Sequence, residues 1–450
     1  MIKSVAILAA ACATIWAQPS LEGNWQGNLA AGPSKLRLVV HITRDSKGEY
    51  ASTLDSLDQG AMAIPIAKTT VAGNALHLDL KALQATYDAT LSGDGASLDG
   101  KFTQGVALPL ALHRVDKPDA PPARPQTPKP PFPYLSEDVT YPNKAARITL
   151  AGTLTIPSGD GPFPAAILIT GSGTHDRDET LFGHKPFLVV ADYLTRRGIA
   201  VLRVDDRRTK SQSMFDDLSG DVLAGVDYLG ARKEINVKQI GVIGHSEGAF
   251  VGPLAASRSD RIAFVVMLAG MGVTGDQLLL KQGESIVRSQ GLGDDAAAAQ
   301  RRMQESIFAI LKEERDEKAA ADKIRALFQK TSPQVSDDAI NAQVNMATAP
   351  EIRAIIASDA APVLRKLKMP VLALNGSRDI QVPASQNLPA IAAALKEAGN
   401  RDFTTTELPN LNHLFQTCKK CTIGEYGELE ETFSPDALKI LGDWIKERTR

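Results

Sequence analysis

One pentapeptide has the residue types and spacing of a catalytic serine. It is Gly244-His245-Ser246-Glu247-Gly248, a Gly-x-Ser-x-Gly pattern in which a strained turn between a strand and a helix lifts the serine hydroxyl above a sheet. An apolar run at residues 240–243 precedes it, and small residues at 249–256 follow it. Both flanking elements are those that the turn requires, so we predict a nucleophile at Ser246 and not an ordinary strand-to-helix connection.

A serine hydroxyl needs a histidine to take its proton, and with this pattern the chain order is serine, acid, histidine. Six of the seven histidines are set aside because they lie in the N-terminal β-rich region, precede the serine, or sit inside the pentapeptide facing away from its hydroxyl: His41, His77, His113, His175, His184 and His245. His413 remains, on a loop before the last predicted helix. We therefore predict His413 as the general base.

The third member should be a carboxylate just after the strand that precedes this loop. Asp379 holds that place, at the end of Asn375-Gly376-Ser377-Arg378-Asp379. It would accept the imidazole N–H of the base, fix its tautomer and stabilise the imidazolium. A helix N-cap or a turn carboxylate is the structural alternative for this residue, whereas Asp205 and Asp206 end a strand that precedes the serine.

Acyl transfer also needs two backbone N–H groups aimed at the developing oxyanion. Glu247 supplies one because it directly follows the nucleophile. The second should come from the loop Thr170-Gly171-Ser172-Gly173, where we assign Ser172, with Gly173 as the one-residue alternative. The same loop lacks the lysine and the spacing of phosphate-binding loops.

The elements that position these residues follow Tyr134, where strands begin to alternate with helices. Strands are expected at residues 148–156, 165–170, 199–204, 239–244, 261–269 and 370–375, and helices at 187–197, 216–229 and 435–450. Continuous apolar strands between helices predict an α/β fold with a mostly parallel sheet covered on both faces. Residues 272–362 interrupt this pattern with apolar residues at helical spacing, which predicts an inserted helical cap.

The residues before this α/β domain, which spans 134–450, form three further segments. Residues 1–17 combine Lys3, a short apolar stretch and small residues, which predicts a signal peptide and export to the periplasm or beyond. Residues 20–115 alternate at strand length between turn signals, which predicts an all-β domain, either a lipocalin-like barrel or a sandwich. Residues 116–133 carry eight prolines and are expected to be an extended linker.

Composition excludes several classes of protein and of site. Lys+Arg 50 against Asp+Glu 52 gives a net charge of −2 over 450 residues, which offers no electrostatic support for a nucleic-acid partner. No apolar segment reaches the length of a membrane span. Cys12 leaves with the signal peptide, and Cys418 and Cys421 are expected to form a local disulfide and not half of a zinc site. We expect no metal and no cofactor, and we assign no oligomeric state.

Four groups of residues together carry a family resemblance. They are Gly171-Ser172-Gly173 with Asp176-Arg177-Asp178-Glu179, the serine pentapeptide, Asn375-Gly376 with Asp379-Ile380-Gln381-Val382-Pro383, and Leu411-Asn412-His413-Leu414-Phe415-Gln416. Over about residues 133–450 the sequence resembles the EstD-like bacterial carboxylesterases of the α/β-hydrolase superfamily. The resemblance implies an α/β-hydrolase fold, esterase activity without a cofactor, and Ser246, Asp379 and His413 as the triad. Related proteins are also labelled serine aminopeptidases, which leaves the substrate class open.

The leading hypothesis is an exported serine carboxylesterase that acts on a small-molecule ester through an acyl-enzyme. The alternative is an aminopeptidase or amidase that uses the same triad and binds the substrate ammonium at an anionic subsite. The nearest candidates for that subsite are Asp176, Asp178 and Glu179, although we expect these charges to pair with Arg177. A third hypothesis, a binding protein on an inactive hydrolase scaffold, is disfavoured by the intact triad.

Overall fold

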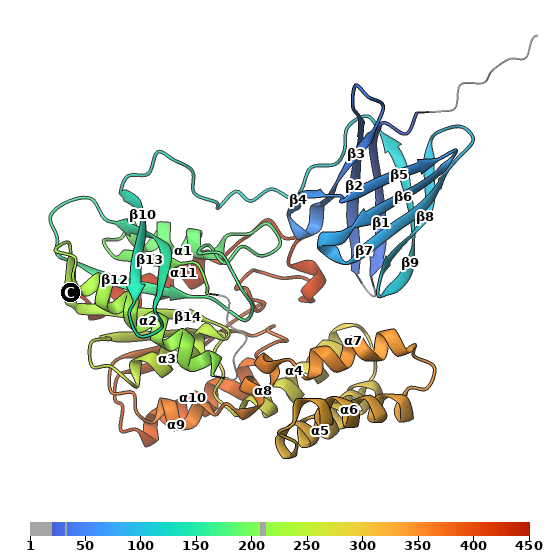
Figure 1. Cartoon of the computed structure of the whole chain (residues 1–450). Coiled ribbons are helices and arrows are strands. Elements are labelled where there is room, and N and C mark those ends of the chain that lie inside the picture. The colour runs from blue at the N-terminus through green and yellow to red at the C-terminus, as the bar shows by residue number, and fades with distance from the viewer. Residues whose placement is uncertain (1–19, 32–33, 208–212) are drawn as a thin grey trace, which may run out of the picture. The chain divides into compact units, whose positions relative to one another are not determined.

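The computed structural model describes residues 20–31, 34–207 and 213–450, which form two compact units. The first unit comprises the described residues up to 57 together with 62–120, and the second comprises 58–61 and 121–450 (Figure 1). The expected signal peptide at residues 1–17 lies outside the described residues. Each unit has a sheet and a hydrophobic core of its own.

Within the described residues, the first unit is built on one sheet of nine strands, in the order β4-β3-β2-β1-β9-β8-β7-β6-β5. The elements in chain order are β1 (Gly23–Ala31), β2 (Ser34–Arg44), β3 (Tyr50–Ser56), η1 (Leu57–Gln59), β4 (Ala61–Pro65), β5 (Lys68–Ala72), β6 (Ala75–Leu80), η2 (Lys81–Leu83), β7 (Ala85–Leu91), β8 (Ser97–Gln104) and β9 (Val106–Val115). Alternate residues face one core around Trp25 and Tyr87 because side chains of a strand alternate between faces. A single curved sheet of this kind is a half-barrel, not the two-sheet sandwich.

Trp25 is a core residue of this half-barrel. Its ring is wholly buried, and its indole N–H donates to the carbonyl oxygen of Leu21 at 2.9 Å. The Arg114 guanidinium lies 4.2 Å from the ring centroid, which adds a cation–π contact. The polar edge of the tryptophan is therefore satisfied without opening the core to water.

The second unit contains a mixed sheet of eight strands among the described residues, in the order β10-β11-β13-β12-β14-β15-β16-β17. They are β10 (Leu135–Asn143), β11 (Ile148–Ile156), β12 (Phe163–Ile169), β13 (Ala200–Val204), β14 (Ile235–His245), β15 (Phe264–Leu268), β16 (Val371–Gly376) and β17 (Phe403–Leu408). Pairing is antiparallel from β10 to β13 and parallel from β13 to β17. The expected mostly parallel sheet is confirmed.

Helices cover both faces of this sheet, as its continuous apolar strands require. On one face, α1 (Pro186–Thr195) and α11 (Pro435–Arg448) pack on a core that includes Leu168. On the other face, α2 (Met214–Gly230), α3 (Gly248–Ala256) and α10 (Ala384–Glu397) pack on a core that includes Ile167. Neighbouring residues of one strand thus belong to opposite cores.

The expected helical insertion lies between β15 and β16. Its helices are α4 (Gly275–Ser289), α5 (Asp294–Glu313), α6 (Glu317–Thr331), α7 (Asp337–Ala347), α8 (Pro350–Ala357) and α9 (Ala360–Leu364), and the short η3 (Ile423–Glu425) follows much later in the chain. Ile307, Leu311 and Ile324 lie in a small core of the insertion itself. Within the described residues, every helix is too short or too polar to cross a bilayer.

The proline-rich segment differs from the expected linker over most of its length. From residue 121 onward it belongs to the second unit. The Arg124 guanidinium donates to the carbonyl oxygens of Leu429, Phe182 and Gly427 at 2.7, 2.8 and 2.8 Å. Proline keeps the backbone extended, but side chains between the prolines attach this stretch to the α/β unit.

Candidate active site

Ser246 occupies the sharp turn that the pentapeptide predicts. It lies between β14 and α3 with a φ of 54°, a conformation that residues other than glycine rarely adopt. The flanking glycines are required by close packing. A Cβ on Gly244 would lie 1.9 Å from the carbonyl oxygen of Gly248, and a Cβ on Gly248 would lie 2.1 Å from that of Ile169. Strand and helix can approach this closely only without those side chains.

The structure brings the three predicted catalytic residues into one hydrogen-bonded line. Nε2 of His413 lies 3.1 Å from Oγ of Ser246, and Nδ1 of His413 lies 2.8 Å from Oδ2 of Asp379. The three residues follow β14, β17 and β16, whose parallel pairing puts their carboxyl ends at one edge of the sheet. This is the geometry that a serine nucleophile, a general base and an orienting carboxylate need.

The Asp379 carboxylate is held on both of its oxygens. Oδ1 accepts the backbone N–H groups of Gln381 and Val382 at 2.8 and 2.9 Å. Oδ2, the oxygen that faces His413, also lies 3.3 Å from the Asn375 side-chain amide. The Asp379 side chain is fully buried, so its carboxylate cannot rotate away from the imidazole without losing several charge-assisted hydrogen bonds.

The two predicted oxyanion donors both line the cavity beside Ser246. Among the described residues, neither the Ser172 nor the Glu247 backbone N–H has a hydrogen-bond partner. The preceding N–H, that of Gly171, is occupied by Glu179 at 2.7 Å. Gly173, the alternative donor, lines a separate hollow of about 50 Å³. The geometry favours Ser172 over Gly173, and their role in catalysis stays a prediction.

The cavity has a volume of about 450 Å³ and is mainly apolar. Its apolar wall includes Phe215, Phe250, Met271, Leu278, Leu279, Ile352, Ile355, Val382 and Leu414. Helices α4 and α8 of the insertion provide four of these residues, at positions 278, 279, 352 and 355. Polar groups are fewer and include Gln282, Gln381, Tyr426 and the acidic Glu179 and Glu247. Such a lining suits a largely apolar ligand.

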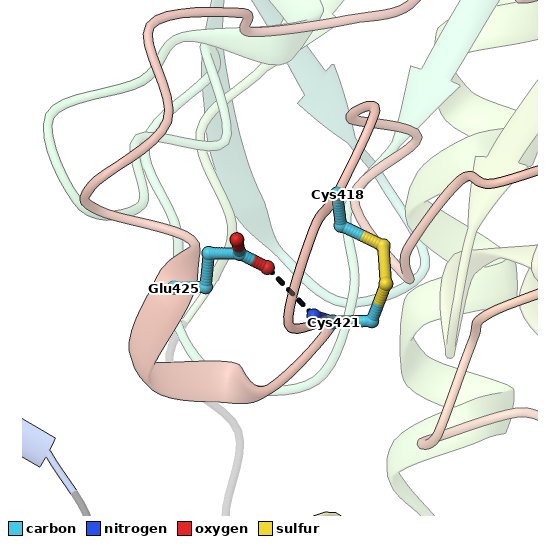
Figure 2. Close-up of side chains that lie close together, drawn as sticks. All are labelled: Cys418, Cys421 and Glu425. Atoms are coloured by element: carbon cyan, nitrogen blue, oxygen red, sulfur yellow. Dashed lines mark hydrogen bonds between the residues drawn. A yellow bond between two sulfur atoms is a disulfide. The ribbon is translucent and has the colours of Figure 1, made fainter.

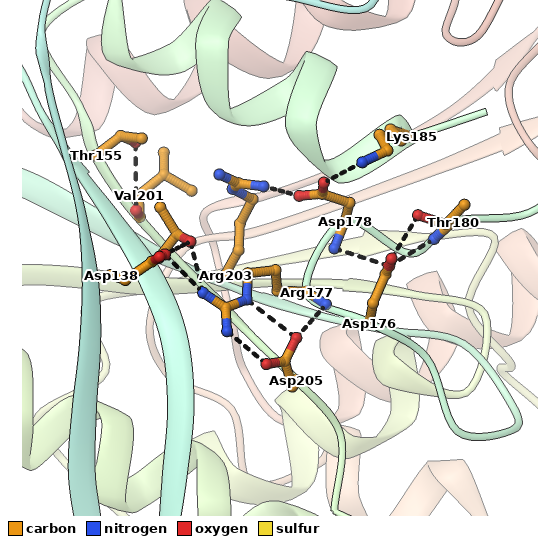
Figure 3. Close-up of polar contacts among 11 residues, drawn as sticks. Asp138, Thr155, Asp176, Arg177, Asp178, Thr180, Lys185, Val201, Arg203 and Asp205 are labelled. Atoms are coloured by element: carbon orange, nitrogen blue, oxygen red, sulfur yellow. Dashed lines mark hydrogen bonds and ion pairs between the residues drawn. The ribbon is translucent and has the colours of Figure 1, made fainter. Parts of the chain in front are cut away.

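The acidic loop after β12 does not pair with Arg177 in the expected way. Figure 3 shows that Arg177 bonds instead to Asp205 and Asp138, at 2.6 and 2.8 Å. The hydrogen bonds to Asp205 raise the pKa of Arg177 above its ordinary value. Asp178 pairs with the buried Arg203, and burial lowers the pKa of that arginine to about 10.

The other two acids of this loop are also occupied. Asp176 accepts the backbone N–H and the hydroxyl of Thr180 at 2.9 and 2.6 Å. Glu179 lies 2.9 Å from Nδ1 of His245. The sequence prediction missed this last pair, because nothing in the spacing links an acidic loop to the histidine of the pentapeptide. No carboxylate of the loop is left without a protein partner among the described residues.

Cys418 and Cys421 lie on the segment that follows His413. Their Cα atoms are 5.0 Å apart, and the structure has the two sulfur atoms bonded. Glu425 accepts the backbone N–H groups of Lys419, Lys420 and Cys421, the last at 2.6 Å (Figure 2). Cys418, Cys421 and Glu425 are the group of potential metal ligands found in the described part of the chain. Because the two sulfur atoms are bonded to each other, they offer no thiolate to a metal. That the disulfide forms in the cell stays a prediction.

The Glu247 side chain predicts a pH dependence of stability. Burial raises its pKa from 4.5 to about 7, Asp206 and Glu351 add to the rise, and a hydrogen bond from Ser172 opposes it. Between these pH values the folded chain keeps a proton that the unfolded chain releases, so the free energy of unfolding falls as pH rises. The full effect is about 3 kcal/mol.

Glu247→Gln imitates the protonated carboxyl and should remove the part of the fall in the free energy of unfolding that Glu247 causes. Urea unfolding at pH 5 and pH 8 measures it, and Glu397→Gln is the control because Glu397 pairs with Arg365 on the surface. Burial also raises the pKa of Asp206, and the fall in the free energy of unfolding that this causes should persist in both variants. An unchanged pH dependence in Glu247→Gln contradicts the assignment.

The fold is of the α/β type, with the candidate site at the carboxyl ends of its parallel strands, and sequence comparison relates the chain to hydrolases. The chain is a relative of esterase-type α/β-hydrolases, which confirms the EstD-like resemblance predicted from the sequence. It is 39% identical over 126 residues to Esterase EstD of Thermotoga maritima, over 27% of this chain and 30% of that protein. Residues 224–417 match the family model described as BAAT / Acyl-CoA thioester hydrolase C terminal. The chain thus matches less than a third of the esterase's own length.

Solved structures with a similar chain path include two hydrolases. An esterase of Pyrococcus furiosus aligns with 70% of this chain and 92% of its own, with a TM-score of 0.44 and 18% identity. Dienelactone hydrolase of Anabaena variabilis aligns with 71% of this chain and all of its own, with a TM-score of 0.40 and 14% identity. The fold class given above rests on the strand order and pairing of this chain's own sheet.

Proposed function

We propose that the protein is a serine carboxylesterase that hydrolyses uncharged esters with short to medium acyl chains. One observation carries the proposal. The line from Asp379 through His413 to Ser246 ends at the wall of an apolar cavity large enough for an acyl chain. The similarity to Esterase EstD and to the acyl-CoA thioester hydrolase family model supports the same class of reaction, which is acyl transfer to water.

The mechanism follows from the positions of these groups. Oγ of Ser246 attacks the ester carbonyl carbon while its proton passes to Nε2 of His413. The oxyanion that forms accepts the N–H groups of Ser172 and Glu247. Nε2 then gives the proton to the leaving alcohol oxygen, and the C–O bond breaks to leave an acyl-enzyme. Water then attacks the acyl carbon while Nε2 of His413 takes its proton, and Nε2 returns that proton to Oγ of Ser246 as the bond from Oγ to the acyl carbon breaks and the acid leaves.

The aminopeptidase alternative needs a carboxylate that is free to bind an ammonium group. Asp176 and Asp178 are committed to Thr180 and Arg203, and Glu179 to His245. An ammonium could bind at Glu179 only by displacing a buried ion pair, which costs several kcal/mol. None of the three acids that the sequence offered for an ammonium subsite is therefore free to bind a charged amino terminus.

Substrate class is tested by kcat/KM on nitrophenyl esters of increasing acyl length, beside an acyl thioester and amino-acid nitroanilides. Each methylene buried in the cavity should raise kcat/KM about fourfold, from roughly 0.8 kcal/mol per group, until the cavity is full. The esters should be cleaved far faster than the anilides. A preference for anilides with a free amino group would replace the esterase proposal with the aminopeptidase.

A pair of substitutions on α8 connects this preference to the cap. Ile355 lines the cavity, whereas the adjacent Ile356 packs in the cap core. Ile355→Ala should shift the optimum toward longer acyl chains. Ile356→Ala, the matched control, should lower stability and leave the optimum in place.

We also propose that residues 1–17 direct export and are removed, and that residues 20–115 are a separate domain before the hydrolase domain. The charged start, apolar stretch and small residues of the first segment support the former. A disulfide at Cys418 and Cys421 would be stable in the oxidising compartment that export implies. N-terminal sequencing of the protein recovered from the export compartment tests whether residues 1–17 have been removed.

A further inference from the structure

A second buried histidine–carboxylate pair lies directly behind the triad. Glu179, which is 1% exposed, accepts the Gly171 backbone N–H at 2.7 Å and lies 2.9 Å from Nδ1 of His245. Nε2 of His245 in turn donates to the backbone carbonyl oxygen of His413 at 3.0 Å. One pair of side chains thus touches the backbone of the oxyanion loop, the nucleophile turn and the loop of the base.

The contacts of His245 put a hydrogen on Nε2 and turn Nδ1 toward the Glu179 carboxyl group. A carbonyl oxygen only accepts, so Nε2 carries a hydrogen, and Nδ1 faces a carboxylate oxygen that already accepts an N–H. Burial alone would lower the pKa of His245, but the charge and hydrogen bond of Glu179 raise it above its ordinary value. The charged and titratable groups that face His245 are the carboxyl groups of Glu179 and Asp379 and the imidazole of His413.

We propose that Glu179 and His245 are positioning residues that lock the oxyanion loop and the base loop onto the nucleophile turn. The proposal rests on the proposed function. Ser246, His413 and the Ser172 N–H can act on the same substrate carbonyl group only if they are held in fixed positions relative to one another. The loops that carry them follow β14, β17 and β12. No other side-chain pair among the described residues bonds to all three.

The Glu179 backbone is consistent with such a role. Its φ is 51°, a conformation unfavourable for a residue with a long side chain. Arg177 and Asp178, the two residues before it, are fixed by ion pairs to Asp205 and Arg203. The loop therefore holds Glu179 in a strained conformation that puts its carboxylate beside Gly171. Strain of this kind persists only where surrounding contacts maintain it.

Glu179→Gln tests the proposal, because it keeps the shape of the side chain and removes its charge. Asp192→Asn is the control, a half-buried carboxylate on α1 whose bonds with Tyr134 and Arg196 do not touch the three loops. We expect kcat on a good ester to fall roughly 100-fold in Glu179→Gln with little change in KM, since misplaced groups weaken the transition state more than the ground state. Asp192→Asn should lose stability and keep kcat.

Two further measurements separate positioning from stability alone. The rate at which a fluorophosphonate labels Ser246 should fall in Glu179→Gln by a factor similar to that of kcat. In a double-mutant cycle with His245→Gln, the double variant should lose no more activity than the worse single variant, because either change breaks the same connection. If His245→Gln does not fold, the comparison of Glu179→Gln with Asp192→Asn still decides the question.

The inference and the proposed function can fail separately. A wild-type protein that neither cleaves esters nor reacts with the fluorophosphonate would remove the proposed function. A wild-type protein that does both, with a Glu179→Gln variant that has lower thermal stability but an unchanged kcat and labelling rate, would overturn the positioning role alone.

Discussion

Replacing Ser246 with alanine should reduce ester hydrolysis by a factor of about 10⁴ to 10⁶, because the remaining oxyanion donors and binding cavity cannot replace a covalent intermediate. The thermal melt should hardly change. Ser246 already adopts a left-handed φ of 54°, which costs alanine about as much as serine, and among the described residues its hydroxyl is hydrogen-bonded to His413. Turnover and melting temperature of the purified variant measure both effects.

Ser257→Ala is the control for this variant. Ser257 follows the same helix α3, and its hydroxyl donates to the Leu254 carbonyl, away from the cavity. This variant should keep full activity. A labelled fluorophosphonate should modify the wild type at Ser246 alone, so labelling at another residue or substantial turnover by Ser246→Ala would remove Ser246 as the nucleophile.

Asp379→Asn should lower kcat by about 10⁴ while the fold is retained. Oδ1 of Asp379 accepts two backbone N–H groups, so the amide oxygen of asparagine must stay on that side. The amide NH₂ then takes the place of Oδ2 and points at Nδ1 of His413. Nδ1 becomes an acceptor, the hydrogen moves to Nε2, and the imidazole can no longer take the proton of Ser246.

Asp402→Asn removes an exposed carboxylate that pairs with Arg448 and should leave kcat unchanged. The Asp379 prediction concerns kcat more than KM, because the carboxylate lies behind the base and does not contact the cavity. An Asp379→Asn variant with near-normal kcat would mean that His413 is oriented by another group.

Most of the parallel part of the fold could be predicted because its central strands contain continuous apolar runs. Residues 165–170 and 239–244 have no polar face, which only a sheet covered on both sides accommodates. The order in which β13 and β12 lie in the sheet was not predictable in this way, because periodicity gives the kind of element and not its neighbours. The attachment of Arg124 to distant carbonyls was missed for the same reason.

The order of serine, acid and histidine along the chain predicted which residues the structure would bring together. Asp379 could be selected because it follows a predicted strand, and His413 because it lies on the loop before the last predicted helix, in the right order along the chain. The Glu179–His245 pair could not, since the two residues are 66 positions apart and one of them was set aside as a turn residue. Arg177 was given the wrong partners because its actual partners, Asp205 and Asp138, are distant in sequence.

The insertion of α4 to α9 between two adjacent strands has a consequence for how such a protein can diverge. The triad residues all follow strands of the sheet, whereas Leu279 and Ile352 of the cavity wall belong to the inserted helices. Mutations in α4 and α8 can therefore change which acyl groups fit while the reacting atoms stay in place. The helices α5 to α7 pack on a core that they share with Leu280 of α4 and Ile356 of α8, so changes in them can reach the cavity wall only through the two helices that line it.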